Sequence, residues 1–321
     1  MDGDSGFVGG RALGRRLLPS QGRVPDDRAA ARLLADARHP VHQSIVRTSR
    51  GRISTILIRP VGATQIVVHL CGNNGLMQDS VPTMLADADA VASAIMGLNY
   101  PGTGGSTGDP SCADDLVQAV TEVVEAAARS FDSVLLKGES LGGAVAVLVA
   151  ARLRPRVRVR VWASRTFADL PSVVCGDGIG GAAAHCALSS VACCTGWTIN
   201  AAAAWAELPS TDRAVIHCRD DDVIPIAGSL YSAVGGRPDA LFRCFGDGAG
   251  APGVAHNAPL DRLINGSGQT AEEAWHAFAR RPAPAWRDVA PRPAVACCCA
   301  GPWLLLAAAA AAAASVALVL A

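Results

Sequence analysis

The sequence predicts an α/β fold in which helices cover both faces of a mostly parallel central sheet. Short apolar runs alternate along the chain with longer segments of helical periodicity, which is typical of parallel sheets. One apolar run also turns sharply into an Ala/Val-rich helix at a single serine. The predicted strands are 44–48, 53–59, 65–70, 94–99, 133–137, 157–163, 214–218 and 240–245, and the first two form a hairpin around Arg50-Gly51. The predicted helices are 27–37, 80–92, 112–129, 141–153 and 227–234.

Composition narrows the class of protein. The 321 residues include 28 Lys and Arg against 28 Asp and Glu. This balance gives no field that would attract nucleic acid, so we expect a small substrate and no nucleic-acid partner. The N-terminus lacks the pattern of a secretory signal. The eleven cysteines are therefore expected to be reduced thiols, and without a CxxC pair no metal site or other cofactor is expected.

Breaks in the strand–helix alternation predict three regions. Residues 1–43 form an N-terminal extension that is partly disordered, and 44–282 form the α/β domain. Within the domain, about 166–207 is longer than one βα connection needs. We interpret it as a helical cap over the serine, with an apolar lining for an acyl chain. The alternative is a set of ordinary helices packed on the edge of the sheet.

The last region, 283–321, is interpreted as a linker and a hydrophobic helix. No charged residue occurs from 293 to 321, and 304–321 would give about 27 Å of helix, enough to span a bilayer core. We expect a single-pass C-terminal membrane anchor with a cytoplasmic catalytic domain, and acylation is conceivable at Cys297, Cys298 and Cys299. The alternative is an alanine-rich soluble tail on a cytoplasmic protein.

The serine at the sharp turn is Ser140, within Gly-Glu-Ser-Leu-Gly. A Cβ at Gly138 or Gly142 would collide where the helix crosses back over the end of the strand. The turn projects the Ser140 hydroxyl from the carboxyl edge of the sheet, as a nucleophile requires. It also directs the amide of Leu141 toward the group that Ser140 attacks, so Leu141 is a predicted oxyanion-hole donor.

A serine nucleophile requires a base and an acid that orients the base. Asp221 follows the strand 214–218 and is the predicted acid, while Asp220 and Asp222 are expected to face water. His256, in the loop 250–257, is the predicted base. The second oxyanion donor is expected after the strand 65–70, with Asn73 the preferred residue, although Asn73 could be an ordinary turn residue.

These motifs together resemble the α/β-hydrolase superfamily over about residues 44–280. The resemblance rests on the loops 69–75 and 99–108, the turn at Ser140 and the positions of Asp221 and His256, and it is closest to the serine esterase, lipase and acyl-thioesterase branches. It implies the α/β-hydrolase fold, a triad of Ser140, Asp221 and His256, and oxyanion amides at Asn73 and Leu141. The sequence departs from the family pattern at Pro101, at Cys218 and in the longer loop at Leu70-Cys71.

The functional expectation is a serine hydrolase that cleaves carboxylic ester or thioester bonds through an acyl-enzyme. A lipid-like acyl substrate is favoured because the predicted cap is apolar and the tail could hold the domain at a membrane. Two alternatives stay open at this point. One is a serine peptidase, and the other is a catalytically inactive hydrolase fold that serves as a membrane-tethered binding scaffold.

Overall fold

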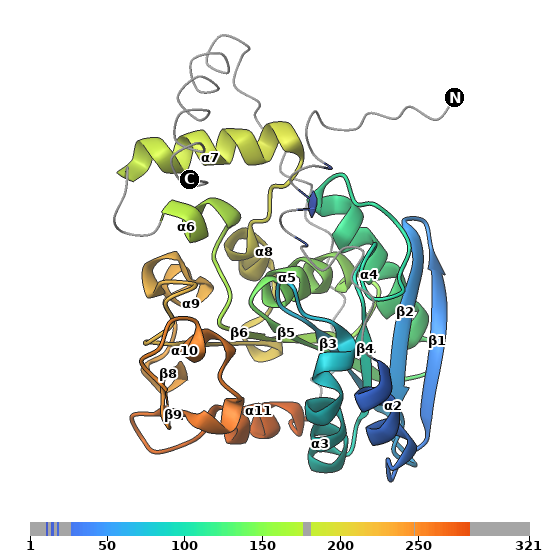
Figure 1. Ribbon diagram of the computed structural model, residues 1–321. Helices are drawn as coiled ribbons and strands as arrows, with labels where there is room; N and C mark the ends of the chain where they lie inside the picture. Colours follow the sequence, from blue (N-terminus) through green and yellow to red (C-terminus); the bar gives the residue numbers. More distant parts are fainter. Residues whose placement is uncertain are drawn as a thin grey trace, which may run out of the picture.

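A computed structural model describes residues 27–175, 181–246 and 248–282, together with positions 11, 14, 15 and 18. Strands in these ranges form one nine-stranded sheet in the order β1-β2-β4-β3-β5-β6-β7-β8-β9. The six strands from β4 to β8 in this order are parallel, while β1, β2 and β9 at the two edges are antiparallel (Figure 1). The predicted fold class is confirmed.

The bounds of the elements agree closely with the predicted ranges. The strands are β1 Val41–Thr48, β2 Gly51–Ile58, β3 Gln65–Leu70, β4 Ala94–Leu98, β5 Ser133–Glu139, β6 Val159–Ser164, β7 Arg213–Cys218, β8 Leu241–Cys244 and β9 Leu263–Asn265. The helices are α2 Asp27–Ala35, α3 Val81–Val91, α4 Ala113–Ala128, α5 Leu141–Leu153, α6 Leu170–Cys175, α7 Gly181–Thr195, α8 Ala201–Glu207, α9 Leu230–Ala233, α10 Val254–Asn257 and α11 Ala271–Ala279.

Each face of the sheet has its own apolar core. One core packs side chains of α4, α5 and α8 against the sheet, and the other packs side chains of α2, α3 and α11 against the opposite face. The central strand β5 contributes side chains to both cores, since Leu136 belongs to the first and Leu135 to the second. Since the parallel strands are covered on both sides, functional side chains are expected at the carboxyl edge of the sheet.

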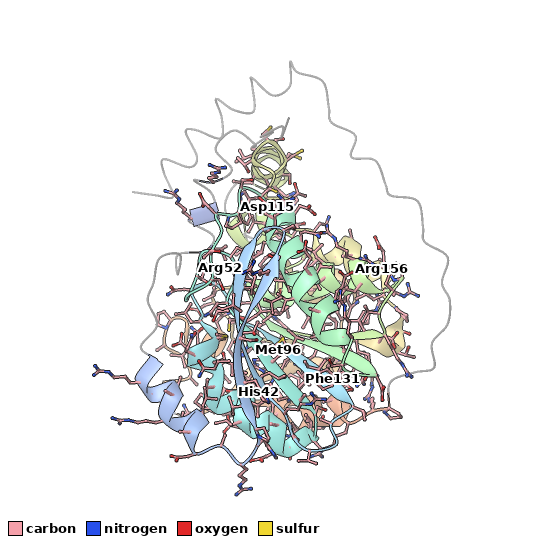
Figure 2. The ribbon with its side chains drawn as sticks, turned by 90° about the vertical axis from the view of Figure 1, so that its right-hand side faces the viewer. His42, Arg52, Met96, Asp115, Phe131 and Arg156 are labelled. Carbon is pink, nitrogen blue, oxygen red and sulfur yellow. The ribbon has the colours of Figure 1, made fainter. Side chains whose placement is uncertain are left out.

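The N-terminal part of the described chain packs on this domain. Strand β1 starts at Val41, so the predicted domain boundary at residue 44 falls inside a strand, and Ala30 and Leu34 of α2 are buried in the second core. The β1–β2 hairpin forms one edge of the sheet. Figure 2 shows this hairpin, with His42 on β1 and Arg52 on β2. Its turn is tied to α4, since Ser49 Oγ donates to Glu122 at 2.5 Å.

Two details differ from the sequence prediction. The predicted helix 227–234 is divided into a 3-10 turn, Ile226–Gly228, and α9, because Ser229 caps the second piece by accepting from the Ser232 amide at 3.1 Å. Strand β9 was not predicted. It contains only three residues, Leu263–Asn265, which is too short for a recognisable alternating pattern.

The insertion between β6 and β7 is helical, as predicted, but its second half belongs to the core. Trp197 and Trp205 are buried with α4 and α5, and α8 packs against α5. This part corresponds to the alternative of ordinary helices on the sheet. In Figure 1, α6 and α7 lie beyond α8 at the top of the view, whereas α3 and α11 lie at the bottom.

Among the helices that the structure describes, none combines the length and apolar character needed to cross a bilayer. The predicted anchor at 283–321 and the cysteines Cys297, Cys298 and Cys299 lie outside the described residues, as does most of 1–26. Membrane attachment of the tail stays a prediction. We expect the full chain to stay in the membrane fraction after carbonate extraction, and a chain truncated after Pro293 to be lost from that fraction.

Candidate active site

The turn between β5 and α5 holds Ser140 in a strained backbone conformation, with φ 54° and ψ −124°. The two flanking glycines make this turn possible. A Cβ at Gly138 would lie 2.2 Å from Gly142 O, and one at Gly142 would lie 2.1 Å from Leu70 O. The steric argument made for these glycines from the sequence is confirmed. Ser140 is thereby presented at the carboxyl edge of the sheet, between β3 and β6.

Three side chains far apart in the sequence meet at this edge. Asp221 accepts a hydrogen bond from His256 Nδ1 at 2.8 Å, and His256 Nε2 lies 3.0 Å from Ser140 Oγ. Because the carboxylate fixes the proton of the imidazole on Nδ1, Nε2 is the acceptor for the Ser140 hydroxyl. The side chain of Asp221 is 0% exposed and that of His256 is 8% exposed. The structure therefore brings together the three residues selected from the sequence.

The carboxylate of Asp221 is well satisfied. Burial alone would raise the pKa of Asp221, but the hydrogen bond from His256 and the His256 charge outweigh burial and lower this pKa. Asp221 Oδ1 also accepts from the amides of Val223 at 3.0 Å and Ile224 at 2.9 Å. Asp221 is consequently an anion at neutral pH, as required of the group that orients a histidine base.

The two neighbouring acids have different partners. Asp220 accepts from the Cys244 amide at 3.1 Å, and Asp222 accepts from the Gly253 amide at 2.9 Å. Both are exposed, as predicted, and the hydrogen bonds of both are to backbone amides. Asp222 nevertheless holds the start of the His256 loop, a role that its position in the sequence did not indicate.

The predicted oxyanion donors lie on two sides of Ser140. Leu141 is the first residue of α5, so its amide has no acceptor within the helix. Asn73 lines the same cavity as Ser140. The preceding residue, Gly72, also lies near Ser140, since a Cβ there would lie 3.8 Å from Ser140 Oγ. The roles of the Leu141 and Asn73 amides stay predictions, and Gly72 joins them as a candidate that sequence reasoning missed.

The loop 99–108 supports the loop after β3. Tyr100 donates its hydroxyl to Cys71 O at 2.9 Å, and Asn99 accepts from the Met77 amide at 2.8 Å. Gly104 permits this packing, because a Cβ there would lie 2.2 Å from the Asn99 side chain. Through these contacts the loop 99–108 packs against the loop after β3.

Ser140 and His256 line a cavity of about 750 Å³. The cavity extends over the face of the sheet toward α3 and α11, where it reaches Asp87, Lys137 and Trp275. The described residues that line it include none from 166–207. The predicted apolar lining from the cap is thus not found in the part of the chain that the structure describes.

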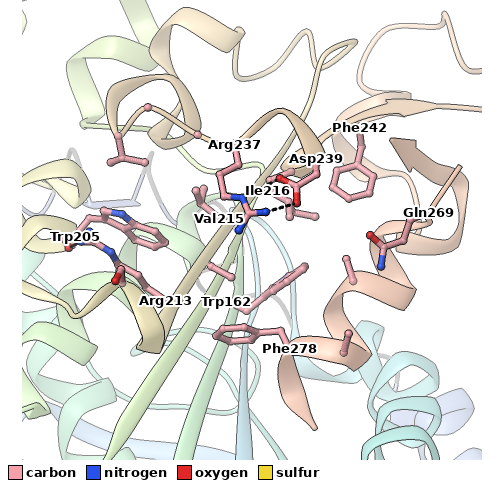
Figure 3. A pocket seen from close by; sticks show the side chains of 18 of the residues that line it. Trp162, Trp205, Arg213, Val215, Ile216, Arg237, Asp239, Phe242, Gln269 and Phe278 are labelled. Atoms are coloured by element: carbon pink, nitrogen blue, oxygen red, sulfur yellow. Dashed lines mark hydrogen bonds and ion pairs between the residues drawn. The ribbon is translucent and has the colours of Figure 1, made fainter. Parts of the chain in front are cut away.

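A second cavity, of about 380 Å³, lies between β6, β7, β8 and α11. Figure 3 shows Trp162, Phe242 and Phe278 around it, with the Arg237–Asp239 ion pair at one side. Its lining includes none of Ser140, Asp221 and His256. Among the described residues, no group of three or more His, Cys, Asp or Glu side chains is arranged to bind a metal ion.

A buried charged cluster next to Ser140 was not predicted. Asp87 accepts from Lys137 Nζ at 2.6 Å, from Trp275 Nε1 at 2.8 Å and from His69 Nε2 at 3.1 Å, and His276 lies 3.8 Å away. Burial would raise the pKa of Asp87, but Lys137 and the histidines lower it well below its ordinary value. Burial, followed by the Lys137 charge, lowers the pKa of His69.

The fold and the turn at Ser140 define the class of protein. The order of the strands, the antiparallel pair at the β1 edge and the serine at the strand–helix turn are those of the α/β-hydrolase fold. No protein-family model matches the chain.

Solved structures with this fold resemble the chain. An α/β hydrolase from Vibrio vulnificus aligns with a TM-score of 0.58 at 15% identity, over 75% of this chain and 88% of that one. An esterase from the archaeon Pyrobaculum calidifontis gives 0.48 at 15% identity over 84% and 95%, and one from Pyrococcus furiosus gives 0.44 at 13% over 61% and 77%. The first of these comparisons establishes the likeness of fold.

Proposed function

We propose that this protein is a serine hydrolase that cleaves carboxylic ester or thioester bonds. The observation that carries the proposal is the hydrogen-bonded chain from Ser140 Oγ through His256 to Asp221, with 3.0 Å and 2.8 Å between the bonded atoms. This arrangement supplies a nucleophile, a base and an orienting acid within bonding distance. The likeness of fold to the α/β hydrolase from Vibrio vulnificus gives secondary support to a hydrolase.

The proposed reaction has two halves. His256 Nε2 takes the proton of Ser140 while Oγ attacks the carbonyl carbon, and the oxyanion forms next to the Leu141 amide and the loop that contains Asn73. His256 then gives this proton to the departing alcohol or thiol, and an acyl-Ser140 ester remains. Water attacks this ester with His256 as the base, which releases the acid and restores the Ser140 hydroxyl. Asp221 stabilises the imidazolium in both halves.

The triad geometry supports cleavage of an ester or thioester bond, whichever acyl group the substrate carries. A lipid-like acyl substrate was expected because of an apolar cap, and the described lining of the Ser140 cavity has no cap residue. We therefore keep the lipid-like substrate as a prediction from the sequence and do not make it a requirement of the proposal.

A fluorophosphonate probe tests the proposal, because it reacts with a serine only when a base activates the hydroxyl. We expect labelling of the wild type, loss of labelling in Ser140→Ala and His256→Ala, and retention in Ser80→Ala. Ser80 is a matched control because it lines the same cavity. Folded wild-type protein that does not react would instead support the binding scaffold.

A comparison of substrates then distinguishes an esterase or thioesterase from a serine peptidase. We expect hydrolysis of p-nitrophenyl acetate and butyrate and of acetyl thioesters, with no turnover of peptide p-nitroanilides. Turnover of the anilides at a comparable kcat/KM would favour the peptidase.

A further inference from the structure

The last residue of β6 and the two residues after it pack directly against the turn at Ser140. Ser164 O accepts from the Ser140 amide at 3.0 Å, and Thr166 Oγ1 donates to Ser140 O at 2.7 Å. Between them, Arg165 Nη2 donates to Glu139 Oε1 at 2.5 Å. Ser164 and Thr166 thus contact the peptide units on the two sides of Ser140, and Arg165 contacts the side chain of Glu139. Arg165 is the one of the three whose side chain reaches further.

The other end of the Arg165 guanidinium contacts the loop of the histidine. Nη1 donates to Ala258 O at 2.5 Å and to Ala255 O at 3.3 Å, so the two acceptors stand on either side of His256 in the sequence. One planar group therefore joins the residue before Ser140 to both flanks of His256. A guanidinium suits this task because its donors have a fixed mutual geometry.

Burial makes this link rigid. The Arg165 side chain is 1% exposed, whereas that of its carboxylate partner Glu139 is 43% exposed. The backbone of Arg165 has φ 47°, a left-handed conformation that is rare outside glycine and needs support from its surroundings. The support includes a bond from the Arg165 amide to Ile216 O at 3.0 Å. A buried cation bonded to Ala255 O, Ala258 O and Glu139 Oε1 has few alternative positions.

We propose that Arg165 is a positioning residue that sets the distance between His256 and Ser140. This inference rests on the proposed function and deepens it. Asp222 holds the loop at Gly253, three residues before His256, and Arg165 holds it at Ala255 and Ala258, on the two sides of His256. Loss of Arg165 lets the imidazole move relative to the Ser140 hydroxyl, whereas Arg165 is only one of many residues that line the cavity, so the chemical step suffers more than binding does.

Arg160 is a matched control on β6, the strand that ends directly before Arg165. It is also buried and donates to carbonyls of another segment, but these belong to Phe278 and Ala279 at the end of α11. Arg160 Nη2 also donates to the side chain of Gln65, at 2.5 Å. Replacement of Arg160 removes similar interactions from the core without touching the His256 loop. It reports the effect of lost stability alone.

The test compares kcat and KM for Arg165→Lys, Arg165→Met, Arg160→Lys and Arg160→Met, each at a temperature where circular dichroism shows a folded protein. We expect kcat of Arg165→Met to fall about 30- to 100-fold with KM within about threefold, and Arg165→Lys to recover part of the loss because one donor remains. The folded Arg160 variants keep the wild-type kcat. If Arg165→Met does not fold, Arg165→Lys decides the question by the same comparison.

A second readout distinguishes positioning from general loosening. A misplaced imidazole costs more for an alkyl ester, whose alkoxide must be protonated as it leaves, than for a p-nitrophenyl ester. We expect the loss in kcat/KM of both Arg165 variants to be larger for ethyl butyrate than for p-nitrophenyl butyrate. Equal losses for both esters, or Arg160 variants that lose as much kcat, would overturn the proposal. Absence of fluorophosphonate labelling in the wild type would instead remove the proposed function, and this inference with it.

Discussion

Lys137 Nζ lies 2.6 Å from Asp87 Oδ2 in a pair that is almost completely shielded from water, on the face of the sheet that borders the Ser140 cavity. The ammonium also lies over the ring of Trp275, 4.5 Å from its centre. Lys137 comes from β5, three residues before Ser140, and Asp87 comes from α3. The pair therefore anchors α3 to the strand that carries the nucleophile.

Removal of the lysine is expected to destabilise the fold strongly. Lys137→Met leaves the Asp87 carboxylate buried with only neutral donors, and the free energy of unfolding should fall by about 3–5 kcal/mol. The double variant Lys137→Met/Asp87→Leu should lose less, because no buried charge remains. Urea unfolding at pH 7 measures both. A single variant as stable as the wild type would contradict this account of the pair.

Asp221 and Asp222 should differ sharply in their effect on activity. Asp221→Asn keeps the shape of the turn but cannot fix the Nδ1 proton of His256, so kcat for p-nitrophenyl butyrate should fall by about 10³- to 10⁴-fold. Asp222→Asn still offers an oxygen to the Gly253 amide and should stay within about threefold of the wild type. Equal losses in the two variants would mean that the acid was assigned to the wrong residue.

Gly142 should tolerate no side chain. The Cβ of Gly142→Ala would lie 2.1 Å from Leu70 O and 2.5 Å from Cys71 O, so the loop after β3 must move away from Ser140. We expect a loss of about 1–3 kcal/mol in the free energy of unfolding and at least about tenfold in kcat/KM. Gly250→Ala is the control, since nothing lies within 4 Å of its added Cβ. An active, stable Gly142→Ala protein would refute the steric argument.

The sequence contained the parts of the site that depend on local pattern. The strand, the serine and the glycines around it specify the turn at Ser140 by sterics alone. Asp221 and His256 could be selected because each follows a predicted strand on the edge where parallel strands end. The choice of Asp221 over its neighbours depended on which carboxylate turns inward, and the structure shows that one bonded to His256.

The parts that depend on distant packing could not be predicted. Lys137 was visible as a charge inside an apolar strand, yet nothing in the sequence paired it with Asp87, fifty positions earlier. Arg165 lay between the last predicted strand before the insertion and the predicted cap, and its partner Ala258 is 93 positions later in the sequence. The second half of the predicted cap packs on the core, as Trp197 shows. In the sequence, an apolar stripe that packs on the core has the same pattern as one that lines a pocket.

His217 should make stability depend on pH in a defined window. It is 0% exposed, stacks on Tyr231, and neither ring nitrogen has a hydrogen-bond partner among the described residues. Burial lowers the pKa of His217 from 6.5 to about 4, despite the opposing charge of Asp221. The folded protein therefore binds this proton less readily than the unfolded chain. The contribution of neutral His217 to the free energy of unfolding is fully present above pH 6.5 and is lost as the pH falls toward 4.

Replacement by an apolar ring should remove this dependence. His217→Phe keeps the ring stack and has no proton to bind, so its free energy of unfolding should fall less between pH 7 and pH 4.5, by on the order of 2–3 kcal/mol relative to the wild type. Urea unfolding at a series of pH values measures the difference, with His42→Gln as a control for the loss of a histidine on the exposed strand β1. Parallel pH curves for the wild type and His217→Phe would show that His217 titrates alike in both states, which burial in this strand would not allow.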